Sequence, residues 1–125
     1  MRFLILDDHE FYCRDLIEYI TLAKQEVYFA KNFREGVEIM EKNPSLVFDV
    51  SFIDIILNNG KTGLHFISRY ESRLGKIIIL TGCIDDNTLE TVKKWEVINK
   101  ADNVLEKLDD IFEEFHVSSP FSLKK

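Results

Sequence analysis

The chain has 125 residues, of which 46% are hydrophobic and 30% charged, and its formal net charge is −6 at pH 7. This length and composition are typical of one globular domain with its own core, and they exclude a disordered segment. The acidic balance argues against nucleic acid as a direct partner, because phosphate contacts need a basic surface. No run approaches the ~20 apolar residues of a membrane span, so we expect no membrane insertion.

The first half of the chain alternates between strand and helix patterns. Residues 2–6 form an apolar run that predicts a buried strand, and residues 10–24 carry apolar side chains at near-helical spacing. Residues 26–30 are rich in aromatic and branched side chains, which favour a strand, and residues 32–42 again have helical spacing. The longest apolar run, residues 44–55, predicts the third strand.

The second half repeats this alternation. Residues 58–63, NNGKTG, predict a loop because two glycines and two asparagines lie together. The remaining elements are a helix over 64–73, a strand over 76–80, a helix over 85–95, a strand over 96–99 and an amphipathic helix over 102–115. We expect the tail, residues 117–125, to fray and to carry no output domain.

This alternation predicts the fold class. Parallel strands need crossover connections, which the intervening helices supply. The strand over 76–80 is apolar on both faces, as in a sheet that helices cover on each side. The expected fold is α/β, a (βα)5 doubly wound three-layer sandwich around a parallel five-stranded sheet.

Polar residues stand where the predicted strands end. Asp7 and Asp8 follow the first strand, Asp54 ends the third, Thr81 the fourth, and Lys100 follows the fifth. Ligands of such sheets bind outside the carboxyl ends of the strands, so we expect these side chains to lie together.

The chemistry of this group points to a cation and a phosphoryl group. Three crowded carboxylates need a cation or protons, and an all-oxygen cluster suits a hard ion such as Mg²⁺, or Mn²⁺. A lysine and a hydroxyl beside that ion suit phosphoryl oxygens. A carboxylate can then be the nucleophile that forms an aspartyl-phosphate.

The motifs LILDDHE, VFDVSFIDIIL, IIILTG and VINKAD, in this order, resemble those of response-regulator receiver domains (CheY-like) of bacterial two-component signalling. The resemblance covers roughly residues 2–116 and implies a receiver domain over 1–116 with the flavodoxin-like strand order 2-1-3-4-5. It also implies that Asp54 is the phosphoacceptor and that the donor is a phosphohistidine on a sensor kinase or phosphotransfer protein. Such a receiver is not a conventional enzyme: it catalyses its own phosphorylation and slow hydrolysis.

The resemblance also assigns the remaining site residues and a partner surface. The metal would be held by Asp7, mainly through water, by Asp8 and Asp54, and by the backbone carbonyl of Ile56, and the phosphoryl group by Thr81, Gly82 and Lys100. The downstream target would dock on roughly residues 85–116. The acids there favour a partly basic partner: Glu90, Glu106, Asp109, Asp110, Glu113 and Glu114.

Some positions depart from the family pattern. Ala101 stands where the family usually has a proline after a cis peptide bond, and Val97 stands where it often has an aromatic switch residue. Asn58 replaces another usual proline, and Gly63 comes one residue late. An alternative is therefore a pseudo-receiver that is never phosphorylated and acts as a constitutive adaptor. If the chain is phosphorylated, we expect slow self-dephosphorylation, because the largely apolar Ile56 and Cys83 stand where side chains flank the attacking water.

Other interpretations of single residues stay open at this point. Asp7 and Asp8 could cap the first helix, and Lys100 could be a solvated surface lysine. Asp49 is a rival to Asp54 but falls at the opposite end of the strand. A haloacid-dehalogenase-type phosphatase is disfavoured, because it would need a second acid where the chain has His9.

The cysteines and histidines carry no predicted site. The three histidines, His9, His65 and His116, are too scattered for a metal cluster, so we expect surface or loop positions for them. Two cysteines are too few for a disulfide framework, and the first strand leaves no room before it for a signal peptide. We therefore expect a cytoplasmic protein, with Cys13 in the core.

Overall fold

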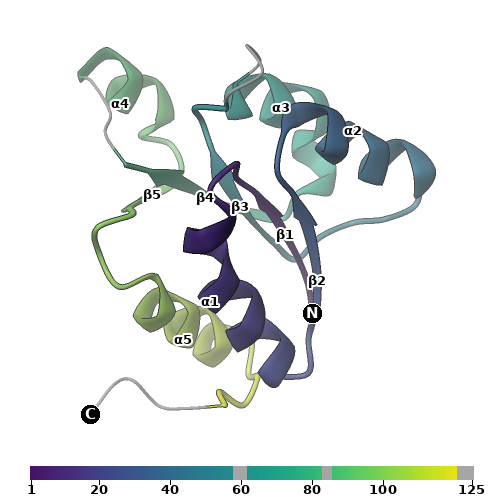
Figure 1. Cartoon of the computed structure of the whole chain (residues 1–125), viewed down its shortest axis with the longest axis vertical. Coiled ribbons are helices and arrows are strands. Elements are labelled where there is room, and N and C mark those ends of the chain that lie inside the picture. The colour runs from purple at the N-terminus through teal and green to yellow at the C-terminus, as the bar shows by residue number, and fades with distance from the viewer. Residues whose placement is uncertain (58–61, 83–85, 121–125) are drawn as a thin grey trace.

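The computed structural model describes residues 1–57, 62–82 and 86–120. Five parallel strands form one sheet in the order β2-β1-β3-β4-β5, which confirms the predicted α/β fold and strand order (Figure 1). The strands are β1 (Arg2–Leu6), β2 (Glu26–Ala30), β3 (Val50–Asp54), β4 (Lys76–Thr81) and β5 (Glu96–Asn99). The helices are α1 (Glu10–Leu22), α2 (Phe33–Lys42), α3 (Gly63–Tyr70) with the 3-10 turn η1 (Glu71–Arg73), α4 (Asp86–Val92) and α5 (Val104–Glu114).

Helices cover both faces of the sheet, so the core has two parts. Phe3 and Ile5 of β1 point to the face covered by α1 and α5, where Cys13 is also buried. Leu4 and Leu6 point to the opposite face, against the side of the sheet that α2 and α3 cover. This alternation follows from the two-residue period of a strand, and it explains why β1 is apolar at every core position.

The third strand is shorter than the sequence predicts. Only Val50–Asp54 pairs in the sheet, whereas residues 44–49 lie outside it. Leu46 and Phe48 are nevertheless buried, and the Phe48 amide donates to the carbonyl of Arg73 at 2.9 Å. Their apolar character therefore reflects packing in the core on the α2–α3 face of the sheet rather than strand pairing.

Several helix ends also differ from the predicted bounds, those of α1 and α3 among them. Helix α1 ends at Leu22, because Lys24 takes a left-handed backbone conformation with φ of 61°. Helix α3 begins at Gly63 and is capped by Thr62. The Thr62 hydroxyl accepts from the His65 amide, and the Thr62 amide donates to His65 Nδ1, which together form a capping box. Residues 58–61 of the predicted loop lie outside the described part of the chain.

The start of the C-terminal tail is held rather than frayed. The Val117 amide donates to the carbonyl of Phe112 at 2.7 Å, and the Ser119 hydroxyl donates to Asp109. Tyr19 of α1 also donates to Asp109, at 2.6 Å. Asp109 is thus buried between α1 and the tail, which corrects its predicted place among the exposed acids of α5.

Within residues 1–57, 62–82 and 86–120, none of the helices is long and apolar enough to cross a bilayer.

Candidate functional site

The carboxyl ends of the strands bring the predicted polar residues to one edge. In the sheet register Asp54 pairs with Leu80, the residue before Thr81. Thr81 in turn pairs with Asn99, the residue before Lys100. Asp54, Thr81 and Lys100 therefore stand next to one another at the carboxyl edge of the sheet. The Lys100 amide donates to the carbonyl of Thr81 at 2.7 Å, which fixes the start of the loop after β5. Asp49 is exposed just before the amino end of β3, where the Arg2 amide donates to it, and so lies at the opposite end of the strand from this group.

Lys100 joins two of the carboxylates. Its ammonium donates to Asp7 Oδ1 at 2.9 Å and to Asp54 Oδ2 at 2.8 Å. Its side chain is 11% exposed and its Nζ lies 5.2 Å from the centre of the Tyr12 ring. Lys100 is therefore part of the acidic cluster and not a solvated surface lysine.

Asp7 and Asp8 do not act as side-chain caps of α1. The N-cap residue is His9, and it makes no side-chain cap bond. Asp7 is fully buried and accepts from the His9 amide at 2.9 Å as well as from Lys100. The Asp8 side chain is 9% exposed, and its Oδ1 is buried without a hydrogen-bond donor among the described residues. Such an atom needs a cation or a proton.

The residues around Asp54 differ in what they offer the site. Thr81 is buried, and its Oγ1 has no hydrogen-bond partner in the described part of the chain. Gly82 is exposed, with open space where a side chain would stand. The Ile56 amide donates to Asp54 Oδ1 at 2.9 Å, while its side chain is exposed. Cys83 lies outside the described residues.

Burial and pairing act in opposite directions on the charges here. Burial raises the pKa of Asp54 above its ordinary value, although hydrogen bonds from Lys100 and the Ile56 amide oppose this. Burial would lower the pKa of Lys100, but hydrogen bonds to Asp54 and Asp7 and their charges raise it overall. Burial also raises the pKa of Tyr12 to about 12. The lysine thus stays charged, while burial disfavours the charged form of the Asp54 carboxylate.

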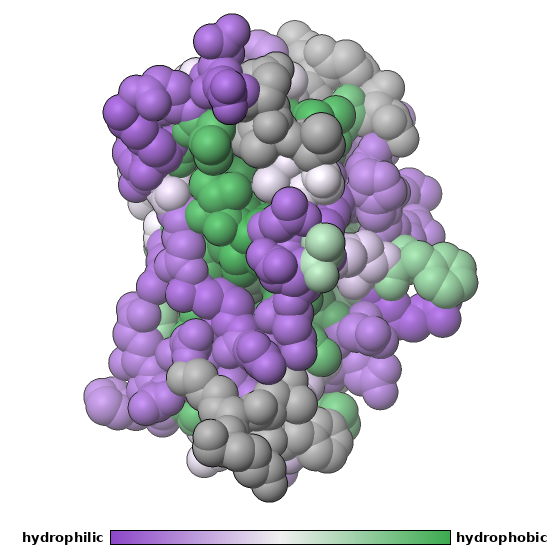
Figure 2. Space-filling view, turned by 90° about the vertical axis from the view of Figure 1, so that its left-hand side faces the viewer, coloured by the Kyte–Doolittle hydropathy of each residue, from purple (hydrophilic) through white to green (hydrophobic). Residues whose placement is uncertain are grey.

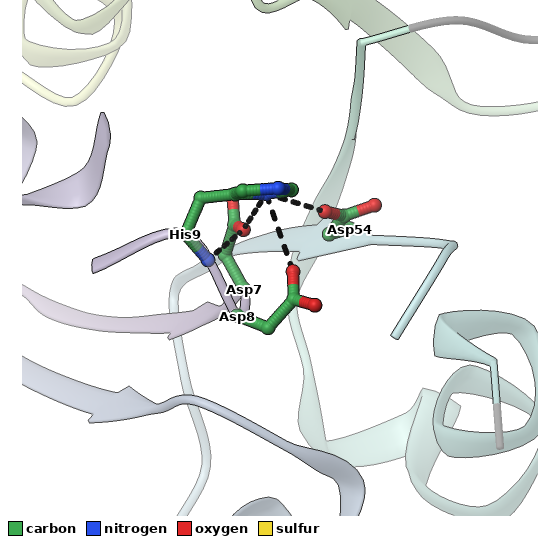
Figure 3. A group of neighbouring side chains, drawn as sticks. All are labelled: Asp7, Asp8, His9 and Asp54. Carbon is green, nitrogen blue, oxygen red and sulfur yellow. Dashed lines mark hydrogen bonds and ion pairs between the residues drawn. The ribbon is translucent and has the colours of Figure 1, made fainter. Parts of the chain in front are cut away.

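His9 is an exposed loop residue, as predicted, with 63% of its side chain exposed, but sequence reasoning missed that its imidazole borders the cluster (Figure 3). Its Nδ1 is 3.2 Å from Asp7 Oδ1, 3.2 Å from Asp8 Oδ1 and 3.7 Å from Asp54 Oδ2. The signal in the sequence was its place directly after two acids at a strand end. The prediction counted the histidines together, whereas a site needs only one of them.

The cluster fits a divalent cation. One ligand atom from each of Asp7, Asp8, His9 and Asp54 lies within 4.8 Å of the others. The three carboxylates supply the oxygen ligands that Mg²⁺ prefers, and the buried, undonated Asp8 Oδ1 is an atom that such an ion would satisfy.

The departures at Ala101 and Val97 leave the cluster assembled. No cis peptide bond occurs among the described residues, so the Lys100–Ala101 bond is trans. The Ala101 amide donates to Asn99 Oδ1 at 2.9 Å, and Lys100 still reaches both carboxylates. Val97 is half-buried and packs against the core on the α2–α3 face. Asn58 lies outside the described residues.

Comparison with known proteins gives fold-level likenesses. No protein-family model and no curated protein matches the chain. A two-component response regulator from Clostridium difficile has a TM-score of 0.75 at 18% identity, covering 93% of this chain and 96% of that one. A response regulator receiver protein from Burkholderia phymatum has 0.75 at 15% identity, covering 96% and 98%. A chemotaxis protein from Vibrio cholerae has 0.69 at 22% identity, covering 88% and 97%. The chain therefore has the fold of response-regulator receiver domains.

Proposed function

We propose that this chain is a signal receiver that accepts a phosphoryl group on Asp54 and changes its protein partners as a result. The observation that carries the proposal is the surroundings of Asp54, which ends β3 in contact with Lys100 and beside further acids. The donor would be a phosphohistidine on a sensor kinase or phosphotransfer protein. Numerous solved structures with this fold are receiver domains, which supports the same role.

The proposed transfer needs few groups. A carboxylate oxygen of Asp54 attacks the phosphorus, an O–P bond forms, and the P–N bond to the donor histidine breaks. The Lys100 ammonium and the Thr81 hydroxyl, which has no other described partner, would contact the phosphoryl oxygens. Asp7, Asp8 and Asp54 would hold Mg²⁺ or Mn²⁺, which neutralises charge on those oxygens when bound.

Phosphorylation by a small molecule tests this proposal. We expect the protein, incubated with Mg²⁺ and acetyl phosphate, to gain one phosphoryl group by intact mass, and Asp54→Asn to gain none. Asp49→Asn removes an exposed acid just before the opposite end of β3, so it should be phosphorylated like the unchanged protein. No adduct on folded protein, with acetyl phosphate or with a phosphohistidine donor, would contradict the proposal and favour the constitutive adaptor.

The edge of the site offers a surface for a protein donor. Phe11, in the first turn of α1, is 83% exposed, and the Arg14 guanidinium lies 4.6 Å from the centre of its ring. Exposed aromatic and arginine side chains of this kind are common anchors of protein interfaces. Because α1 starts beside His9, a bound protein donor would cover Phe11, whereas acetyl phosphate would not reach it.

We therefore expect Phe11→Ala to slow phosphorylation by a phosphohistidine protein by roughly tenfold, about the effect of losing 1.4 kcal/mol of binding. Its rate with acetyl phosphate should stay unchanged. Leu22→Ala is the matched control, because Leu22 is also exposed on α1 but at its opposite end. Equal slowing with both donors would place Phe11 in the site itself rather than in a docking surface. The measurement is a time course of phosphoprotein formed from each donor.

The face formed by α4, β5 and α5 is the proposed surface for the downstream target. On this side of the molecule a hydrophobic strip lies between hydrophilic side chains (Figure 2). Leu89 of α4 is exposed, and Val97 of β5 is half-buried. Exposed acids remain on α5, Glu106, Glu113 and Glu114 among them, which supports a partner with some basic character.

A further inference from the structure

We infer that His9 is a further ligand of the divalent cation through Nδ1 and that it shifts the preference of the site from Mg²⁺ toward Mn²⁺. This inference rests on the proposed cation site, and it adds a nitrogen ligand to what the acids alone would supply. It concerns which ion the site selects, and it does not depend on whether Asp54 is phosphorylated.

The distances around His9 match neighbouring ligands of one ion. Two ligands at right angles on an ion with bonds of about 2.1 Å are about 3 Å apart. His9 Nδ1 lies 3.2 Å from Asp7 Oδ1 and 3.2 Å from Asp8 Oδ1. Figure 3 shows the imidazole over the carboxylates, which come from two different strand ends. One ion can therefore contact the ring nitrogen and both acids once the Lys100 ammonium, which lies 2.8 Å from Nδ1, moves aside.

Asp8 points independently to a cation at this place. Its side chain is nine-tenths buried, and its Oδ1, which lies 3.2 Å from His9 Nδ1, has no hydrogen-bond donor within residues 1–57, 62–82 and 86–120. The Lys100 ammonium contacts Asp7, Asp54 and, at 2.8 Å, His9 Nδ1, so a positive group already stands against the ring nitrogen, while Asp8 Oδ1 is left without a donor among the described residues. A cation that took the place of the ammonium at Nδ1 would also satisfy this buried oxygen.

The choice of ion follows from the ligand types. Mg²⁺ prefers oxygen ligands and gives up its waters reluctantly, whereas imidazole suits first-row transition ions. A site with carboxylates and one neutral imidazole should therefore favour Mn²⁺ more than a site of carboxylates alone. The competing interpretation is a positively charged imidazole that pairs with the acids. In that case removing His9 would strengthen the binding of every cation.

Electron paramagnetic resonance of bound Mn²⁺ separates these interpretations. We expect the unchanged protein to show the electron spin-echo modulation of a directly bound imidazole nitrogen, and His9→Gln to lose it. Titration of Mn²⁺ against Mg²⁺ should show the Mn²⁺ preference falling by roughly tenfold in His9→Gln, in the range typical of changes around metal ligands. His65→Gln, which changes a histidine in the α3 capping box, should keep both signals.

The outcomes also separate this inference from the proposed function, because no phosphodonor is present. An absent nitrogen signal in the unchanged protein, or Mn²⁺ affinity that is equal or higher in His9→Gln, would overturn the role of His9. A retained nitrogen signal in a protein that acetyl phosphate cannot phosphorylate would support His9 as a ligand. It would count only against the phosphoacceptor role of Asp54.

Discussion

Lys100→Met is expected to lower the free energy of unfolding by about 3 kcal/mol at neutral pH without added cation, as for other buried ion pairs that lose one partner. The Lys100 side chain is 11% exposed, and the Asp7 and Asp54 side chains that it contacts are 0% and 5% exposed. Methionine keeps the apolar stem but removes the charge, so two buried carboxylates would repel each other without a counter-ion.

The pH dependence of this loss has a definite sign. The Lys100 pKa is raised in the fold, so its contribution to stability is full below the ordinary lysine pKa and is lost as pH rises through the raised value. In Lys100→Met the Asp54 pKa should rise further, because Lys100 opposes the effect of burial on it. A raised carboxyl pKa gives most stability at low pH, so the loss caused by the substitution should shrink on acidification.

Urea unfolding at several pH values, with a chelator present, measures this effect. Lys93→Met is the matched control, since Lys93 is an exposed lysine that pairs only with Glu90 among the described residues, and it should cost less than about 1 kcal/mol. Adding Asp54→Asn to Lys100→Met should recover part of the loss, because one unpaired charge disappears. A loss as small as that of Lys93→Met would show that Lys100 is not the counter-ion of the cluster.

The site was largely predictable because the fold places strand ends together. Asp54, Thr81 and Lys100 are far apart in sequence, but each ends or follows a strand of a parallel sheet, so topology alone predicts that they meet. The direction in which the side chain of His9 points was not predictable in the same way. His9 was missed because its contact with the acids depends on how the chain turns into α1, which the pattern of apolar residues does not encode.

The errors in the fold have a similar physical origin. The apolar run over 44–55 predicts one long strand, since a buried loop and a buried strand have the same composition. Asp109 fits the polar spacing of α5, yet the buried Tyr19 hydroxyl, distant in sequence, and the partly buried Ser119 hydroxyl of the tail both donate to it. Hydrogen bonds between distant residues decide such positions, and local spacing says nothing about them.

Gly63→Ala is expected to lower the free energy of unfolding by about 2–3 kcal/mol, the cost of overpacking a buried position, and Tm by roughly 10 °C. A Cβ on Gly63 would lie 2.2 Å from the Asp54 carbonyl oxygen and 2.7 Å from Ile53 Cγ2. Both neighbours belong to β3, whose backbone is fixed by pairing with β1 and β4, so it cannot yield cheaply. The start of α3 or the end of β3 must therefore shift.

The same substitution should also slow phosphorylation, because β3 ends in Asp54 and a shift there moves the acceptor away from Lys100. Thermal unfolding and the acetyl phosphate reaction, measured on one preparation, test both effects. Gly82→Ala is the control for stability alone, since a Cβ there meets nothing within 4 Å and should change the free energy of unfolding by less than about 0.5 kcal/mol. Equal stability of the two variants would mean that α3 can move away from β3 freely, and that close packing at Gly63 does not hold Asp54 in place.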